Sequence, residues 1–317
     1  MTSVTLEPVT GPMTSQTTIP ATFEASVIVP CYNSARHLQV LLEALILQSF
    51  TGVWELIVVN RGSTDQTAQI VREYAPQFAH LNLIDEPDNH GVSYSRNDGA
   101  SRARSENLIF IDSDDIPNQR YLAAMLEALE TSAFVCASMD YAALNPDWIV
   151  AAFAQEIEGG IHNPVAPYAN GGNIGIKKSV FEALNGFDTT LPAFEDLDFS
   201  WRVFKLGHRM LLVKDAVLAY RVNPDLAALY RKCHRDSLPN ARVLRKNFPD
   251  YVPAWMCLLG LGARAVLIAL STLTLFNRGR LARWVLACAY WRGDLEGCVR
   301  ERYLYLLPRG RSPRESI

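Results

Sequence analysis

Short apolar runs that alternate with helix-like stretches are the feature that most constrains how this chain can fold. The runs lie at Val27–Val29, Trp54–Val59, Leu81–Ile84 and Asn107–Ile111. Leucines at helical spacing follow the first run, and residues 65–75 form a second helical pattern. Strands that are apolar throughout are typical of parallel sheets, which helices cover on both faces. We therefore predict an α/β fold with a mainly parallel sheet flanked by helices.

Polar clusters directly follow three of these apolar runs. They lie at residues 30–33, 60–65 and 112–115, and we expect Pro30 to end the first strand. The carboxyl ends of parallel strands meet at one edge of the sheet, which is where ligands bind in such folds. Residues far apart in the sequence are therefore expected to form one site at this edge.

The last of these clusters is acidic, because Asp112, Asp114 and Asp115 surround Ser113 at the end of an apolar run. Carboxylates this close repel one another, and a divalent cation most naturally offsets the repulsion. A hard ion such as Mg²⁺ or Mn²⁺ that also bridges a diphosphate fits this chemistry. An acidic turn without a ligand is the alternative interpretation of the cluster taken alone.

Several motifs occur in a fixed order and are specific as a set, although each is weak alone. They are Val27–Asn33, Gly62–Asp65, Asn89–Asn97, Asp112–Asp115, Gly186–Asp188 and Glu195–Arg202. This succession resembles the family-2 inverting glycosyltransferases, which have the GT-A fold, over about residues 25–215. The resemblance implies a nucleotide-diphospho-sugar transferase with a Rossmann-like, mainly parallel sheet.

The resemblance also assigns roles to individual residues. Asp196 is implied as the catalytic base and Asp114 as the metal ligand, with Mg²⁺ or Mn²⁺ as the cofactor. The implied nucleotide-sugar pocket consists of Pro30, Tyr32, Asn33, Asn60, Gly62, Ser63, Arg96, Asp112, Ser113, Gly172, Asn173 and Glu195. The expected donor is a UDP sugar, and the acceptor is a glycan, a lipid-linked molecule or a small molecule in polysaccharide or glycoconjugate biosynthesis. No nucleic acid partner is expected.

Asp196 has an argument of its own, because Glu195 and Asp196 precede an amphipathic helical pattern. A helix dipole stabilises carboxylates in its first turn, so a plain helix cap is the structural interpretation. The functional interpretation is that one carboxylate takes the proton from an acceptor hydroxyl as it attacks the sugar. For Arg96, the alternative to nucleotide binding is an ion pair with a carboxylate that has only a structural role.

The chain departs from the family pattern at two places. Many relatives carry an acidic pair where this chain has Asn60 and Arg61, which leaves the nucleotide base open. Relatives also often have a metal-binding histidine where this chain reads Val217–Arg221. The ion is then held by Asp114, the diphosphate and water, or His234 reaches it from the next helix.

Two other functions are alternatives to glycosyl transfer. Nucleotidyl transfer also uses acids and Mg²⁺ on an α/β sheet, but it normally needs a basic, glycine-rich loop after the first strand, and the sequence has none there. A scaffold or binding protein with a transferase fold would explain Asn60 and Arg61. The presence of both Asp114 and Asp196 argues against that function.

Charge divides the chain into an acidic front and a basic end. Residues 1–220 carry 13 basic and 26 acidic side chains, whereas residues 221–317 carry 17 and 7. We predict a flexible arm at 1–24 that is not a signal peptide, a GT-A catalytic domain at 25–222 and a basic helical region at 223–317. The basic region suits an anionic membrane surface, although solvated helical faces are the alternative.

Residues 252–276 are mostly apolar, but Arg264 interrupts them, so a membrane span is doubtful. We expect this segment to lie at a membrane interface or to pack on the catalytic domain as a lid or an oligomer contact. The six cysteines have no paired or metal-binding spacing, which indicates reduced thiols. The expected location is cytoplasmic, with peripheral attachment to the inner face of the plasma membrane.

Overall fold

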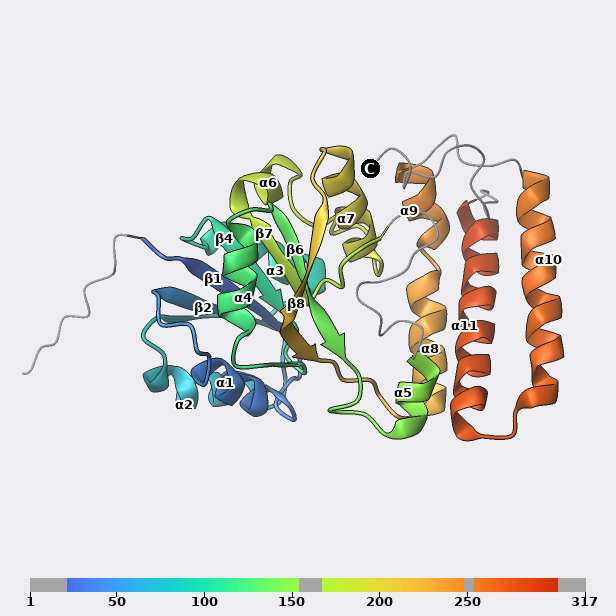
Figure 1. The fold of residues 1–317 in the computed structure, drawn as a ribbon, viewed down its shortest axis with the longest axis horizontal. Helices are drawn as coiled ribbons and strands as arrows, with labels where there is room; N and C mark the ends of the chain where they lie inside the picture. Colours follow the sequence, from blue (N-terminus) through green and yellow to red (C-terminus); the bar gives the residue numbers. More distant parts are fainter. Residues whose placement is uncertain (1–21, 154–166, 248–253, 302–317) are drawn as a thin grey trace, which may run out of the picture.

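A central sheet with helices on both faces forms the larger part of the protein, and a group of helices extends it at one side (Figure 1). The structure is a computed structural model that describes residues 22–153, 167–247 and 254–301. Most of the predicted N-terminal arm, residues 154–166 and the last arginines of the chain lie outside the described residues.

The sheet has eight strands, and the four predicted apolar runs form one half of it. Its order is β3 (Leu81–Glu86), β2 (Trp54–Arg61), β1 (Ala25–Cys31), β4 (Asn107–Ile111), β7 (Asn173–Lys177), β6 (Phe134–Asp140), β8 (Met210–Ala219) and β5 (Ile116–Pro117). β3, β2, β1 and β4 are parallel, as predicted, and β6 is parallel to β8. β7 runs antiparallel to both β4 and β6, so the sheet is mixed but mainly parallel.

Two hydrophobic cores lie on opposite faces of the sheet. In β1, Val27 and Val29 point into one core and Ile28 into the other, as the alternation of side chains along a strand requires. The first core is covered by α1 (Leu38–Ile46), α2 (Thr67–Tyr74) and α4 (Tyr121–Leu129). The second is covered by α3 (Val92–Arg102), α6 (Lys178–Ala183) and α7 (Glu195–Lys205). Burial on both faces explains why these strands are apolar throughout.

The prediction that Pro30 ends the first strand was wrong. β1 continues through Pro30 to Cys31, and Pro30 lies opposite Val59 of β2. The pairing of β1 with β4 ends earlier, at Ile28, so this part of the strand has a neighbour on one side only. Proline, which lacks a backbone N–H, is tolerated in strands at such edges.

The C-terminal helices pack on the sheet domain through α5 (Asp147–Phe153) and α7. They are α8 (Leu226–Ser237), α9 (Asn240–Asn247), α10 (Ala254–Ser271) and α11 (Arg278–Glu301). α11 contacts α5, α8 and α9, and α10 lies outside α11, farthest from the sheet (Figure 1). A buried cluster that includes Tyr141, Ile149, Leu229 and Leu286 joins α5, α8 and α11. Within the described ranges, no helix has the length and apolarity needed to cross a membrane.

Candidate active site

The acidic loop Asp112–Asp115 lies at the carboxyl end of β4. Asp115 is buried, and its Oδ1 accepts a hydrogen bond from the backbone N–H of Arg221 at 3.1 Å, while its Oδ2 has no partner among the described residues. Burial, followed by the charges of Asp112 and Asp114, raises the pKa of Asp115 well above its ordinary value. Burial and Asp112 likewise raise the pKa of Asp114. The loop therefore gathers negative charge that the described residues neutralise only in part.

Arg96 joins this loop to the start of α7. Its guanidinium is buried, and it donates through Nη2 to Oδ1 of Asp112 at 2.7 Å and through Nη1 to Oε1 of Glu195 at 2.8 Å. The guanidinium also lies over the ring of Phe187, with its carbon 5.4 Å from the ring centroid. A planar guanidinium with several N–H groups can hold two carboxylates at once, which lysine cannot do with the same geometry. Arg96 thus brings together acids that come from β4 and α7.

Asp196 lies in the first turn of α7, which begins at Glu195 after Phe194 in the left-handed conformation (φ 57°). Its Oδ1 accepts a hydrogen bond from the N–H of Leu197 at 2.7 Å, and its Oδ2 accepts one from the N–H of Gly171 at 3.1 Å. Both bonds favour the charged carboxylate, but burial, followed by the charge of Glu195, outweighs them and raises the pKa of Asp196 to about 7. A general base works best with a pKa near the working pH.

Tyr220 follows β8 directly and connects the two groups of acids electrostatically. Burial raises the pKa of its phenol well above the ordinary value, and Asp115, Asp112, Asp114 and Asp196 raise it further, in that order. One phenol therefore lies within electrostatic reach of both the acidic loop and the first turn of α7. Asp114 and Asp196 are 82 positions apart in the sequence, but the Arg96 bridge between Asp112 and Glu195 brings the segments that carry them together.

The loops after β1, β2 and β4 are tied together by hydroxyl and amide groups. The N–H of Asn33 donates to Oγ of Ser63 at 2.8 Å, and Oδ1 of Asn33 accepts from the N–H of Thr64 at 2.9 Å. The hydroxyls of Ser34 and Ser113 lie 2.7 Å apart. The carboxyl ends of the strands thus form one continuous rim, as the sequence predicts for a parallel sheet.

Three further residues of the implied pocket lie on this rim in different environments. Pro30 is buried within β1, whereas the side chain of Tyr32 is 56% exposed. Gly62 has a positive φ of 68°, which lets the chain turn at the end of β2, and its N–H donates to the carbonyl of Glu86 at 2.8 Å. Tyr32 is therefore free to move toward a ligand, while Pro30 and Gly62 shape the backbone.

Asn60 and Asn173 have their amide groups fully engaged with protein partners. Asn60 donates through Nδ2 to Asp85 at 2.7 Å, and its Oδ1 accepts from Oγ of Ser63 at 2.5 Å. Asn173 donates to the carbonyl of Ala137 at 2.7 Å and accepts from its N–H at 3.1 Å, which fastens β7 to β6. Their direct contact with a donor stays a prediction.

Arg61, which stands where relatives carry an acid, is buried rather than solvated. It forms an ion pair with Asp98 of α3, and its guanidinium carbon lies 4.8 Å from the centroid of the Tyr94 ring. The pair fastens the end of β2 to α3. The positive charge of Arg61 is therefore balanced inside the protein.

Gly171 and Gly172 lie against the charged groups of the site. A Cβ atom at Gly171 would overlap the guanidinium of Arg96, and one at Gly172 would overlap the carboxylate of Asp112. Only glycine leaves room for the Arg96 ion pairs at these two positions. Gly172 was predicted from the sequence, whereas the bond from Gly171 to Asp196 was not.

The oxygen donors of the acidic loop fit a hard divalent cation. Asp114 and Asp112 offer carboxylate oxygens, and the raised pKa of Asp114 indicates a charge that a cation would stabilise. Within the described ranges, no group of three His, Cys, Asp or Glu side chains is placed to hold a metal by itself. His234 was the alternative metal ligand expected from the sequence. Its Nε2 instead lies 3.3 Å from Oε2 of Glu296 in α11, and its ring stacks on that of Tyr230. A cation here would thus need oxygens from a bound diphosphate or water.

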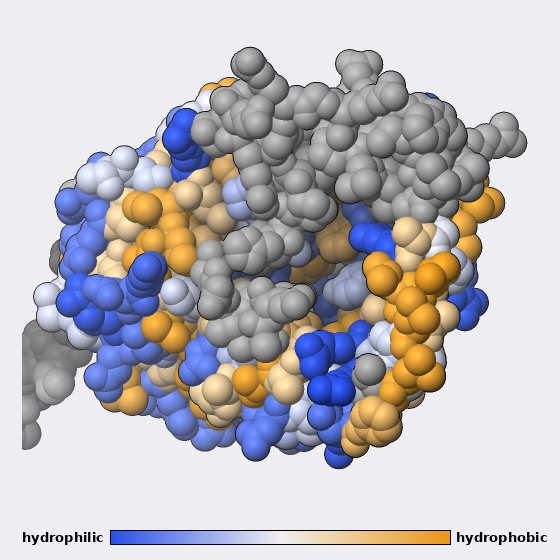
Figure 2. Space-filling model, turned by 45° about the vertical axis from the view of Figure 1, so that its right-hand side comes forward, coloured by the Kyte–Doolittle hydropathy of each residue, from blue (hydrophilic) through white to orange (hydrophobic). Residues whose placement is uncertain are grey.

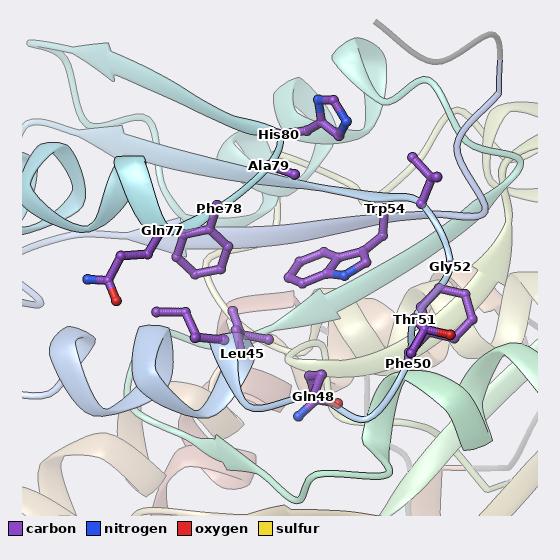
Figure 3. A pocket seen from close by; sticks show the side chains of 12 residues that line it. Leu45, Gln48, Phe50, Thr51, Gly52, Trp54, Gln77, Phe78, Ala79 and His80 are labelled. Atoms are coloured by element: carbon purple, nitrogen blue, oxygen red, sulfur yellow. The ribbon is translucent and has the colours of Figure 1, made fainter. Parts of the chain in front are cut away.

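A cavity of about 370 Å³ lies away from these acids, at the amino end of β2 (Figure 3). Trp54 and Phe78 line it edge to face, with ring centroids 6.1 Å apart, and Leu45 and His80 complete its walls. Ligands of parallel α/β sheets bind at the carboxyl edge, which is opposite to this cavity. None of the predicted site residues lines it.

Sequence reasoning missed several residues that shape the site. Arg221 bonds Asp115 through its N–H and reaches the carbonyl of Asp114 through Nε at 3.2 Å. Lys232 of α8 lies close enough to lower the pKa of Asp114. A cation placed directly after a strand, as Arg221 is, was the available signal. No comparable signal marked Lys232, because it is one of several basic residues in its helix.

Comparison with known proteins adds an independent line of evidence. The model of Glycosyl transferase family 2 matches residues 26–184. The uncharacterized glycosyltransferase YibD of Escherichia coli strain K12 is 35% identical over 129 residues, which are 40% of this chain and 35% of that protein. The putative glycosyltransferase EpsE of Bacillus subtilis strain 168 is 27% identical over 248 residues, 72% of this chain and 86% of that protein.

A solved structure is similar over most of the chain. The mannosyltransferase PcManGT from Pyrobaculum calidifontis, in complex with GDP-Man and Mn²⁺, is 20% identical, with a TM-score of 0.65 over 90% of this chain and 89% of that one. This similarity confirms the predicted α/β GT-A fold with C-terminal helices. With the family model matching half of its length, the chain belongs to glycosyl transferase family 2.

Proposed function

We propose that this protein transfers a sugar from a nucleotide diphosphate sugar to an acceptor hydroxyl with inversion, in a single metal-assisted displacement. The observation that carries the proposal is Arg96, which holds Glu195 of the α7 start and Asp112 of the acidic loop on one guanidinium. A displacement reaction needs a base and an anion-binding group fixed relative to each other. Family membership supports the same reaction class.

Asp196 is proposed as the base. Its pKa of about 7 leaves a large fraction of the carboxylate ionised at neutral pH and still gives it an appreciable affinity for a proton. The N–H groups of Leu197 and Gly171 fix the orientation of the carboxylate. Asp196 would accept the proton of the acceptor hydroxyl as its oxygen bonds to the anomeric carbon, while the nucleoside diphosphate leaves from the opposite face.

Asp114 and Asp112 are proposed to hold the divalent cation together with the donor. When bound, Mg²⁺ or Mn²⁺ supplies positive charge that stabilises the departing diphosphate. Arg96 orients Asp112 through a hydrogen bond of 2.7 Å, and the backbone N–H of Arg221 fastens the neighbouring Asp115. The Mn²⁺ in the complex of the archaeal PcManGT supports this choice of ion.

The nucleoside is proposed to lie on the rim formed by the loops after β1 and β2. Asn33 and Ser63 are linked there at 2.8 Å, and the exposed ring of Tyr32 stands beside them. The expected donor is a UDP sugar. The GDP-Man in the structure of PcManGT makes a guanine nucleotide the alternative.

Residues 25–222 are proposed as the catalytic domain, and residues 223–317 as a basic helical region that serves the acceptor side. The acceptor is a glycan, a lipid-linked molecule or a small molecule of polysaccharide or glycoconjugate synthesis. The five cysteines within the described residues are free thiols, which supports a cytoplasmic location. Peripheral attachment at the inner face of the plasma membrane follows from the surface described below.

Product analysis with a panel of nucleotide sugars, Mn²⁺ and the wild-type protein tests the proposal. Release of a nucleoside diphosphate is expected, whereas release of pyrophosphate would indicate nucleotidyl transfer, and binding without turnover would indicate a scaffold. Asp196→Asn should keep donor binding and lose transfer, because the amide cannot accept the proton. Asp215→Asn, at an exposed position of β8, is the control and should keep both. Equal loss of binding and transfer in Asp196→Asn would contradict the role of a base.

A further inference from the structure

The outer face of α10 is apolar and open to solvent over several turns. In the part of the chain that the structure describes, three apolar residues of α10 are 58% to 65% exposed, and two more beyond the helix, Leu273 and Phe276, are 72% and 84% exposed. We define the outer face by Val266, Leu267, Leu270, Leu273 and Phe276. Figure 2 shows apolar atoms gathered in a strip on the right, over this outermost helix. A contiguous apolar patch on a folded protein marks a contact surface.

The opposite side of α10 packs on α11. These contacts fix the orientation of α10, so its outer face points away from the protein. The indole N–H of Trp284 donates to the carbonyl of Ile268 at 3.1 Å, and that of Trp291 donates to the carbonyl of Leu261 at 3.0 Å. Leu261 is buried there. Arg264 reaches across to Asp294 of α11, with Nη1 and Oδ2 2.9 Å apart. α10 is therefore apolar on both its packed and its open side.

Arginines predominate beside the outer face, and the nearest acid, Asp294 of α11, is paired with Arg264. Residues 254–293 contain five arginines and neither Asp nor Glu. Three of them, Arg278, Arg280 and Arg283, are exposed just beyond Phe276, where the chain turns into α11. An apolar face that ends in a group of arginines is complementary to a lipid surface with anionic headgroups.

The same charges disfavour a second copy of this chain as the occupant of the face. Two copies packed side by side in parallel along α10 would bring their terminal arginines together. Like charges across an interface weaken association when no acid lies between them.

We propose that the outer face of α10 and the arginines that follow it form the surface by which this protein lies on an anionic membrane. The helix lies parallel to the membrane plane, because its exposed apolar residues follow one another along its length. α11 joins this surface to α8, whose Lys232 acts on Asp114. The proposal concerns binding to lipid and does not depend on the transfer reaction.

Co-flotation of the full-length protein with vesicles is the test. Wild type should float at low salt with vesicles of phosphatidylcholine and phosphatidylglycerol, and much less with phosphatidylcholine alone. The double variant Leu270→Ser with Phe276→Ser should lose at least about tenfold in vesicle affinity, because two large apolar side chains no longer enter the interface. Arg280→Ala with Arg283→Ala should weaken binding to the anionic vesicles only, and should make the remainder less sensitive to salt.

Leu47→Ser is the matched control, since Leu47 is 61% exposed at the end of α1, a helix of the sheet domain. It should float like wild type. The unfolding temperatures of all variants and their sizes by light scattering are measured in parallel. Absence of wild-type flotation at low salt, or equal flotation of the Leu270 and Phe276 double variant, would overturn the proposal. So would a wild-type dimer that this double variant converts into a monomer, because the face would then be a self-association surface.

Discussion

Nη1 of Arg96 lies 2.8 Å from Oε1 of Glu195, although 99 positions separate the two residues in the sequence. The second nitrogen of the same guanidinium lies 2.7 Å from Oδ1 of Asp112. The first turn of α7, which carries Asp196, is thus held against the acidic loop by one buried side chain. This pairing links the part of the site proposed for proton transfer to the part proposed for the diphosphate.

Replacing Arg96 by methionine should therefore damage both stability and donor binding. Methionine fills a similar volume but leaves Glu195 and Asp112 without their cation, and breaking a buried ion pair costs about 3 kcal/mol or more in the free energy of unfolding. Urea unfolding measures the loss. Arg102→Met on the same helix is the control, because the side chain of Arg102 is 47% exposed and its ion pair is worth about 0.5 kcal/mol at most. An equal loss in the free energy of unfolding for both variants would contradict a stabilising role of the Arg96 ion pairs.

The rate of transfer should rise with pH around neutrality. Asp196 has a pKa of about 7, so it is mostly protonated below that pH and cannot accept the proton of the acceptor. We expect kcat at saturating donor and cation to increase as the pH passes through about 7 and then to level off. A pH series of initial rates checks this. A flat profile between about pH 6 and 8 would exclude Asp196 as the base whose ionisation limits the rate.

The pH dependence of protein stability tests the raised pKa of Asp196 without any substrate. The unfolded chain releases the Asp196 proton near pH 3.8, whereas the folded protein keeps it up to about 7. The unfolded state therefore binds fewer protons in this window, and the contribution of Asp196 to stability falls as pH rises through it. Asp196→Asn removes this contribution, so its free energy of unfolding relative to wild type should be higher at about pH 8 than at about pH 5. Urea unfolding at both pH values gives the difference, and a constant difference would contradict the raised pKa.

The fold could be predicted from the sequence because the strands at the centre of its parallel half, β1, β2 and β4, are buried on both faces. Ile28 and its neighbours Val27 and Val29 enter opposite cores, so the run has no polar position, and that pattern directly indicates a covered parallel sheet. The pattern cannot show how distant strands pair. The antiparallel placement of β7 between β4 and β6 depends on register and packing over many residues, and no local motif encodes it.

The sequence predicted those site residues that directly follow a strand. It did not reveal which predicted side chains are already bonded to another part of the protein. Asp112 and Asp114 directly follow β4, and topology places them at the ligand-binding edge. The sequence gives no sign that Ala137 engages the amide of Asn173 or that Asp98 pairs with Arg61. These partners come from elements that lie far apart in the chain, so only the structure brings them together.

Asp114→Ala should weaken the cation-dependent binding of the donor. The thermal shift that Mn²⁺ and a nucleoside diphosphate cause together should shrink in this variant, since stabilisation by a ligand grows with the logarithm of its concentration relative to its dissociation constant. Mn²⁺ alone should cause little shift in either protein, because no three side chains within the described ranges form a metal site. Asp215→Asn is the control for loss of an exposed acid. An unchanged joint shift in Asp114→Ala would remove this residue from the cation site.

Gly171→Ala should disable the site through sterics alone. The added methyl group would overlap the guanidinium of Arg96, which has to give up its position between Glu195 and Asp112, and the bond from Gly171 to Asp196 would shift with it. Overpacking of this kind costs about 1–3 kcal/mol, and donor binding should fall together with the unfolding temperature.

Gly262→Ala is the matched control, because nothing lies within 4 Å of a Cβ at that position of α10. Alanine is the better helix former, so this variant should keep donor binding and gain up to about 1 kcal/mol in the free energy of unfolding. Urea unfolding and a donor-induced thermal shift on both variants separate the two outcomes. Full donor binding by Gly171→Ala would show that Arg96 can leave its ion pairs without consequence, and the bridge between the acidic loop and α7 would then have no part in binding.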